Sequence, residues 1–203
     1  MIIDVWYNIN IIYEGWCTMK TYTIVGGVNG CGKSSLTGVL RTEIDNLGKI
    51  IDVDKITVGC GGNLLEGGKK AVALIDECLE KEFCFTQETT LSGRKTLNTI
   101  KRAIDKDYYI RLYYVGLDTM EESLLRIENR VRKGGHNINT DTVMKRFEKR
   151  FEDLLAVLPY CNEATFYDND NGFVTVAKYK NGELQPIGQN SPRWLLELIE
   201  KMR

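Results

Sequence analysis

A chain of 203 residues is long enough for one α/β domain with a full core, and short for two. Its 27 basic and 28 acidic side chains leave a net charge of −1. A chain without an excess of positive charge lacks the usual signature of a nucleic-acid-binding protein, so we do not expect nucleic acid as a partner. The six cysteines are scattered without a C-x-x-C pair, and no apolar run approaches the length of a membrane span, so we expect a cytoplasmic protein without disulfides, structural zinc or a membrane segment.

The first eighteen residues differ from the rest of the chain. Residues 1–7 carry an acid where a secretory signal needs basic side chains, and no small-residue cleavage site follows. The β-branched and aromatic run Thr21–Val25 is typical of a buried strand, and Met19 is a natural place for the domain to begin. We therefore expect residues 1–18 to be an N-terminal extension outside the core, and residues 19–203 to form a single domain.

A glycine-rich turn follows the first strand. Residues 27–34 match the phosphate-loop pattern of a glycine, four residues and Gly-Lys-Ser, and a helical pattern over residues 35–41 follows. Glycines let backbone N–H groups converge on phosphate oxygens, while Lys33 can reach the terminal phosphates and Ser34 can ligate Mg²⁺. For Cys31 we favour a small-residue packing role over an oxidation-sensitive thiol. The expected nucleotide-binding residues are Gly27, Val28, Asn29, Gly30, Cys31, Gly32, Lys33, Ser34 and Ser35.

The remaining chain alternates strands and helices, which predicts an α/β fold with a mainly parallel sheet and helices on both faces. Four further strands are expected at residues 49–54, 82–88, 108–115 and 165–167. Helices are expected at residues 69–80, 93–105, 118–132, 140–158 and 192–202. The glycine-rich residues 59–68 are interpreted as a mobile loop, and residues 174–184 alternate around Asn181-Gly182, which predicts a small C-terminal hairpin.

Acidic residues end two of the expected strands. Asp52 and Asp54 end the second strand and Glu88 ends the third, where ligands of parallel sheets bind. Phosphoryl transfer to a hydroxyl needs a carboxylate that accepts its proton and a group that holds Mg²⁺. We favour Asp54 as this base; Asp52 is the alternative, and Asp54 could instead cap the next segment. Glu88 could serve the metal, the hydroxyls of a substrate, or the helix that begins near Gly93.

Basic residues gather in the second half of the chain. Residues 94–150 hold fourteen Lys and Arg against eight Asp and Glu, and residues 133–137 form a glycine-containing, hinge-like loop. Pairs of arginines four residues apart share a helix face on either side of this loop: Arg126 with Arg130, and Arg146 with Arg150. This arrangement is typical of a lid that closes over a triphosphate, which we expect at about residues 118–158. A solvated helical hairpin is the alternative.

Three stretches in this order resemble the zeta-toxin-like branch of P-loop kinases. They are the phosphate loop, residues 87–93 (Q-E-T-T-L-S-G) and residues 130–136 (R-V-R-K-G-G-H), and the resemblance runs from about residue 19 to residue 179. It implies a P-loop NTPase three-layer fold with a helical lid. It further implies an ATP- or GTP-dependent kinase that uses Mg²⁺, acts on the sugar 3′-hydroxyl of UDP-N-acetylglucosamine, and can have an antitoxin partner. The lone His136 in the third stretch is expected to be exposed and idle.

The resemblance also implies roles for individual residues. Asp54 matches the family's catalytic aspartate, while Lys33 and Ser34 match its phosphate and metal residues. Glu88 matches the acid that ends the third strand near the substrate. The substrate-binding residues expected on this basis are Glu88, Thr89 and Thr90.

Two lid arginines of the family contact the γ-phosphate. Arg130 resembles the first and Arg146 is the best candidate for the second, with Arg132 and Arg150 as competitors. The chain looks like the short branch that carries a Gly-Gly-His lid, whereas the founding toxins have longer substrate-side insertions. Two other functions stay open: a nucleotide-dependent switch, and a kinase that acts on another metabolite or on a nucleic-acid end.

Overall fold

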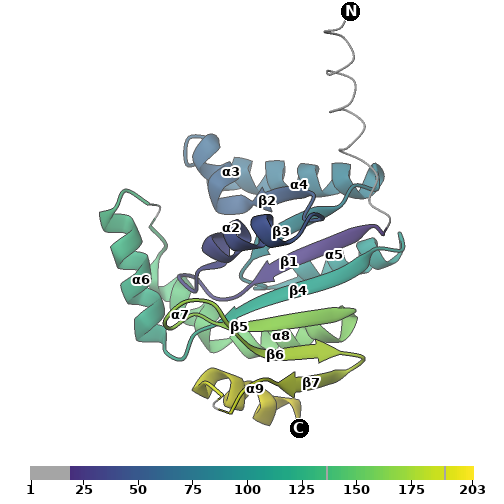
Figure 1. Ribbon diagram of the computed structural model, residues 1–203. Helices are drawn as coiled ribbons and strands as arrows, with labels where there is room; N and C mark the ends of the chain where they lie inside the picture. The colour runs from purple at the N-terminus through teal and green to yellow at the C-terminus, as the bar shows by residue number, and fades with distance from the viewer. Residues whose placement is uncertain (1–18, 136, 190) are drawn as a thin grey trace, which may run out of the picture.

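The computed structural model describes residues 19–135, 137–189 and 191–203, so the predicted N-terminal extension and His136 lie outside the described residues. The described chain forms a seven-stranded sheet with strand order β2-β3-β1-β4-β5-β6-β7 (Figure 1). The strands are β1 Thr21–Gly26, β2 Lys49–Asp52, β3 Phe85–Thr89, β4 Tyr109–Gly116, β5 Glu163–Asp168, β6 Val174–Lys180 and β7 Glu183–Pro186. Strands β1 to β5 run parallel, while β6 and β7 are antiparallel. The predicted mainly parallel sheet with a C-terminal hairpin is confirmed.

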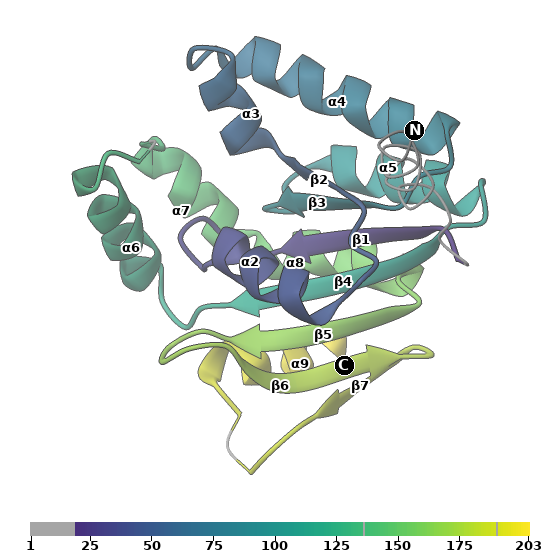
Figure 2. The same cartoon turned by 45° about the horizontal axis from the view of Figure 1, so that its top comes forward.

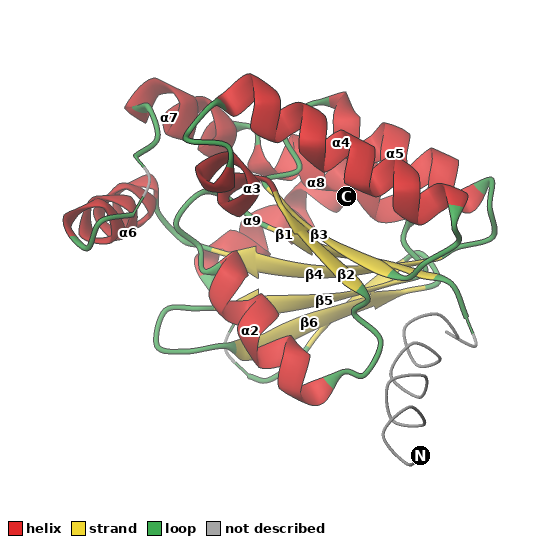
Figure 3. Ribbon diagram, turned by 90° about the horizontal axis from the view of Figure 1, so that it is seen from above, coloured by secondary structure: helices red, strands yellow, loops and turns green. Residues whose placement is uncertain are grey.

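Helices cover both faces of this sheet (Figure 3). The helices are α2 Lys33–Glu43, α3 Val53–Gly59, α4 Leu64–Glu80, α5 Arg94–Ile104, α6 Met120–Arg132, α7 Thr140–Glu148, α8 Arg150–Val157, the short 3₁₀ helix η1 Leu158–Tyr160 and α9 Arg193–Met202. Helix α2 lies on one face, and α4, α5, α8 and α9 lie on the other (Figure 3). Helices α6 and α7 project beyond the carboxyl ends of the parallel strands (Figures 1 and 2). Within the described residues, no helix combines the length and apolar character needed to cross a membrane.

Two apolar clusters fill the space between these layers. In β1, Tyr22 and Ile24 belong to the larger cluster with α4, α5, α8 and α9, while Val25 belongs to the cluster under α2. Successive side chains of a strand point to opposite faces, so one strand supplies both clusters. Because both faces of the central strands are covered, even their polar residues are buried, among them Thr23 of β1 and Thr86 of β3. The buried strands are fixed relative to one another, and the candidate site lies at their carboxyl ends.

The prediction of a mobile loop at residues 59–68 is wrong, because α4 already begins at Leu64. The Asn63 side chain caps this helix by accepting hydrogen bonds from the backbone of its first turn. Gly67 lies where α3 crosses α4, and a Cβ there would be 2.1 Å from Thr57 Oγ1. Part of the local glycine content therefore reflects a close helix crossing, which composition alone does not distinguish from a loop.

The single helix predicted for residues 140–158 is divided at Lys149 into α7 and α8. The two helices serve different clusters: Phe147 of α7 packs in the cluster near the phosphate loop, whereas Phe151 and Leu154 of α8 pack in the larger one. A continuous apolar spacing is compatible with one helix or with two that change direction. The break matters for the site, because α7, unlike α8, packs in the cluster beside the phosphate loop.

Replacing Trp194 by Ala is expected to lower the free energy of unfolding by about 3–5 kcal/mol. The Trp194 ring is 1% exposed, packs against Gly116 and donates from Nε1 to Asp168 Oδ1 over 2.8 Å. Its loss leaves a cavity and an acceptor without its donor. Leu196, on the same helix and 51% exposed, is the matched control, and Leu196→Ala should cost about 0.5 kcal/mol or less. Urea unfolding measures both, and equal losses would contradict a core role for the indole.

Candidate active site

The loop between β1 and α2 has the curled backbone of a phosphate-binding turn. Gly27 and Gly30 adopt positive φ angles of 141° and 77°, a region that side chains disfavour. The neighbouring chain also excludes a side chain there, because a Cβ at Gly27 would lie 2.4 Å from Val115 O. Lys33 Nζ donates to the carbonyl oxygens of Gly27 and Val28 over 2.9 Å each, so its ammonium lies across the loop.

Ser34 faces two buried carboxylates at the ends of β2 and β3. Asp52 and Glu88 are register partners on these strands and are only 7% and 6% exposed. Ser34 Oγ donates to Glu88 Oε2 over 2.6 Å and lies 3.5 Å from Asp52 Oδ2. Glu88 Oε1 is buried and has no hydrogen-bond partner among the described residues. Hydroxyl and carboxylate oxygens are the ligands that Mg²⁺ prefers, and Glu88 Oε1 has no hydrogen bond that a cation would have to displace.

Strand β2 ends at Asp52, two residues earlier than expected, and Asp54 lies in the first turn of α3. Asp52 Oδ1 accepts hydrogen bonds from Asp54 N at 3.0 Å and Lys55 N at 3.2 Å, so Asp52 is the residue that caps α3. The Lys55 ammonium lies 3.3 Å from Asp52 Oδ2. Asp54 itself is exposed. The capping role thus belongs to Asp52, and the Asp54 carboxylate is presented to solvent at the carboxyl edge of the sheet.

The other two expected substrate-binding residues serve the turn between β3 and α5. Thr89 Oγ1 lies 3.2 Å from Thr96 Oγ1 and accepts a hydrogen bond from Leu91 N over 3.0 Å. Thr90 Oγ1 donates to Ser92 Oγ over 3.1 Å. Both hydroxyls therefore have local partners in the described structure. Glu88, by contrast, does not cap α5, whose N-cap position is a glycine without a side-chain hydrogen bond.

Among the lid arginines, Arg146 reaches the phosphate loop. Its Nη1 donates to Asn29 Oδ1 over 3.1 Å. Ser123 of α6 meets the same residue, because its Oγ donates to Asn29 O over 2.7 Å. Both helices beyond the sheet edge therefore contact one residue of the loop.

The remaining candidate arginines take different positions. Arg130 is half-buried and lines a cavity of about 400 Å³ with Arg126, Asn129, Lys133 and Gly135. Arg132 is exposed and pairs with Glu128 of its own helix over 2.8 Å.

Arg150 points away from the phosphate loop. It donates to Phe147 O over 2.9 Å and to Glu197 of α9 over 2.6 Å, and its guanidinium stacks on the rings of Phe147 and Phe151. The expectation that Arg146 and Arg150 share one helix face is therefore wrong. The break at Lys149 separates them.

Sequence reasoning missed Asn169, which links α6 to the phosphate loop. Asn169 Nδ2 donates to Cys31 O over 2.9 Å, and Asn169 O accepts from Arg126 over 2.6 Å. A signal existed, since Asn169 directly follows β5 and ligand sites of parallel sheets lie at the carboxyl ends of strands. Cys31 itself is buried in the cluster under α2, and burial raises the pKa of its thiol. These features support the packing role for Cys31.

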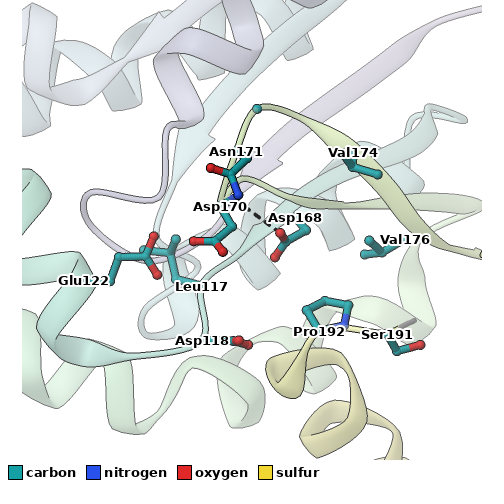
Figure 4. A pocket seen from close by; sticks show the side chains of 11 residues that line it. Leu117, Asp118, Glu122, Asp168, Asp170, Asn171, Val174, Val176, Ser191 and Pro192 are labelled. Atoms are coloured by element: carbon teal, nitrogen blue, oxygen red, sulfur yellow. Dashed lines mark hydrogen bonds between the residues drawn. The ribbon is translucent and has the colours of Figure 1, made fainter. Parts of the chain in front are cut away.

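A second cavity of about 390 Å³ lies between the start of α6, the β5–β6 loop and the residues before α9 (Figure 4). Its acidic residues are Asp118, Glu122, Asp168 and Asp170. Three of them have structural partners: Asp118 Oδ1 accepts from Trp194 N and Asp168 Oδ1 from Trp194 Nε1, each over 2.8 Å, and Glu122 pairs with Arg126. None of the residues predicted for the active site lines this cavity.

The strand order, the glycine-rich loop between β1 and α2, and the helices beyond the sheet edge define a P-loop α/β fold. No family model matches the chain. A protein of Haemophilus influenzae (strain ATCC 51907 / DSM 11121 / KW20 / Rd), described as uncharacterized, is 31% identical over 137 residues, which is 65% of this chain and 96% of that protein. The chain belongs to the same family as this Haemophilus influenzae protein.

Solved structures share the fold at low sequence identity. A chain from the PezAT chromosomal toxin–antitoxin system of Streptococcus pneumoniae has a TM-score of 0.64 at 16% identity, over 98% of this chain and 91% of that one. A chain of AvrRxo1-ORF1:-ORF2 with ATP gives 0.67 at 15% identity, over 91% of this chain and 63% of the other. A chain of the Pnkp1/Rnl/Hen1 RNA repair complex gives 0.56 at 18% identity, over 66% and 45%.

Proposed function

We propose that residues 19–203 form a single cytoplasmic kinase domain that transfers a phosphoryl group from ATP or GTP, with Mg²⁺, to a hydroxyl of a small acceptor. UDP-N-acetylglucosamine is the acceptor that we propose, as in the zeta-toxin type. The observation that carries the proposal is the convergence of Ser34 on Glu88 and Asp52, next to a loop crossed by Lys33. A loop for phosphates beside a buried carboxylate pair is the arrangement that phosphoryl transfer requires.

The structural neighbours support the same class of protein. One neighbour was solved with ATP, and another belongs to a chromosomal toxin–antitoxin system. We extend the proposal to an antitoxin as a protein partner of this chain. At 15 to 16% identity these likenesses support the fold. The acceptor and the antitoxin are parts of our proposal.

The residues of the chain divide the work of transfer. Lys33 would exchange the carbonyl oxygens of Gly27 and Val28 for terminal phosphate oxygens of the nucleotide. Asp54 would accept the proton of the acceptor hydroxyl while that oxygen bonds to the γ-phosphorus. The bond from the γ-phosphorus to the β–γ bridging oxygen breaks, and the nucleoside diphosphate leaves.

The metal would be held by Ser34, with Asp52 and Glu88 as the adjoining carboxylates. When bound, Mg²⁺ neutralises part of the phosphate charge. On the lid side, we propose that Arg130 and Arg146 complete the site by stabilising the charge on the transferring phosphoryl group. Arg146 has the more direct support, since it already contacts the phosphate loop.

Incubation of the purified chain with Mg²⁺, γ-labelled ATP or GTP and UDP-N-acetylglucosamine is expected to yield a phosphorylated sugar nucleotide. Parallel reactions contain other hydroxylated metabolites, a 5′-hydroxyl oligonucleotide, or no acceptor. Label on another metabolite or on the oligonucleotide would keep the kinase class and overturn the acceptor. Hydrolysis that no acceptor accelerates, together with nucleotide-dependent capture of a partner, would favour a nucleotide-dependent switch instead.

A further inference from the structure

Asn29 is the residue of the phosphate loop at which α6 and α7 meet. Its side-chain oxygen accepts from Arg146 Nη1, and its backbone oxygen accepts from Ser123 Oγ. Asn29 is only 6% exposed; its contact with Ser123 is buried, and its contact with Arg146 is partly buried. The two donors come from positions 94 and 117 residues further along the chain. A buried polar residue that hydrogen-bonds to two other elements in this way helps to fix the phosphate loop, α6 and α7 relative to one another.

The contacts differ in how readily they can change. Ser123 is fully buried and its carbonyl closely approaches Gly30, where a Cβ would lie 2.7 Å away. Arg126 of the same helix is joined to Cys31 through Asn169. Helix α6 is therefore fixed to the loop at two points. Among the described residues, Arg146 makes one hydrogen bond, to the neutral amide of Asn29, and its other guanidinium N–H groups can bind an anion while that bond is kept.

Two cations of distant origin lie on consecutive residues of the loop. Lys33 Nζ is bonded to the carbonyls of Gly27 and Val28, and Arg146 to the side chain of Asn29. Each uses a neutral oxygen as its acceptor. Hydrogen bonds from a cation to phosphate are stronger than bonds to neutral acceptors, so a terminal phosphate at this loop would attract Lys33 and the remaining N–H groups of Arg146.

We propose that Asn29 is a positioning residue that holds Arg146 over the phosphate loop before the nucleotide binds. This inference rests on the proposed function, because it assumes that Arg146 then contacts the terminal phosphate. Holding the guanidinium in place beforehand removes the cost of immobilising a long side chain during binding, which is worth up to about tenfold in affinity. A nucleoside diphosphate has no γ-phosphate, and its binding should be insensitive to Asn29.

The test is a double-mutant cycle with Asn29→Ala and Arg146→Ala, read by calorimetric binding of a non-hydrolysable triphosphate and of the matching diphosphate. Asn29→Ala is expected to weaken triphosphate binding by up to about tenfold and Arg146→Ala by at least as much, with diphosphate binding changed less than about twofold in both. In the Arg146→Ala background, Asn29→Ala should have no further effect, because the residue that it positions is absent. Arg102→Ala, which removes an exposed arginine that pairs with Asp76, controls for lost positive charge.

Two results would overturn the inference while leaving the proposed function intact. Multiplying effects in the double variant would mean that Asn29 acts independently of Arg146. Equal losses of triphosphate and diphosphate binding would mean that Asn29 only supports the loop, and the melting temperature of each variant shows whether that loss is structural. A wild-type chain that binds neither nucleotide would overturn both the inference and the proposed function.

Discussion

Lys33→Ala is expected to lower kcat/KM for phosphoryl transfer by about a thousandfold or more. The Lys33 ammonium is the cation that the loop itself supplies, and its two present acceptors lie within the phosphate-binding turn. Its removal takes away an attraction that becomes stronger in the transition state, because negative charge develops on the leaving bridging oxygen. The loss should therefore fall on kcat as well as on the affinity for the triphosphate.

Initial rates with varied nucleotide measure the Lys33 effect. Lys70→Ala is the matched control, because Lys70 is exposed on α4 and lies outside the phosphate loop. Lys33 makes its hydrogen bonds within the loop, so the variant should unfold at a denaturant concentration close to that of the wild type. A Lys33→Ala chain that is folded and transfers phosphate at the wild-type rate would show that the loop is not a phosphate site.

The second large effect is expected at Asp54 rather than at Asp52. Asp54→Asn should lower kcat by about 10²- to 10⁴-fold with nucleotide affinity unchanged, because an amide cannot accept the proton of the acceptor hydroxyl. Asp52→Asn should instead raise the Mg²⁺ concentration needed for half-maximal rate, since Asp52 faces Ser34. Asparagine is also a good N-cap, so this variant should keep α3 intact.

Magnesium titrations of kcat in the two variants separate these roles. Asp105→Asn, an exposed acid at the end of α5, controls for the loss of a negative charge. If Asp52→Asn abolishes transfer at every Mg²⁺ concentration while Asp54→Asn behaves as the wild type, then Asp52 is the base. That outcome would reverse the preference for Asp54 and would leave the kinase class untouched.

Local patterns predicted most of the fold. The alternation of strands and helices, the Asn181-Gly182 turn and the phosphate loop each depend on residues that are close in the chain. The structure confirms the alternation, the turn, and a loop with positive-φ glycines between β1 and α2. The errors occurred where one local pattern has two physical causes. Glycines at residues 59–68 were interpreted as a loop, although Gly67 is needed for a helix crossing. A continuous apolar spacing at residues 140–158 concealed the break at Lys149.

The sequence by itself was enough to predict the phosphate loop, because its pattern lies within eight consecutive residues. It also placed acids at the ends of the second and third strands. Only the tertiary structure decided how those acids are used: strand register brings Asp52 and Glu88 together at Ser34, and the start of α3 makes Asp52 the cap. Only the tertiary structure brought Arg146 to Asn29, 117 residues away, because no local preference encodes where a helix packs.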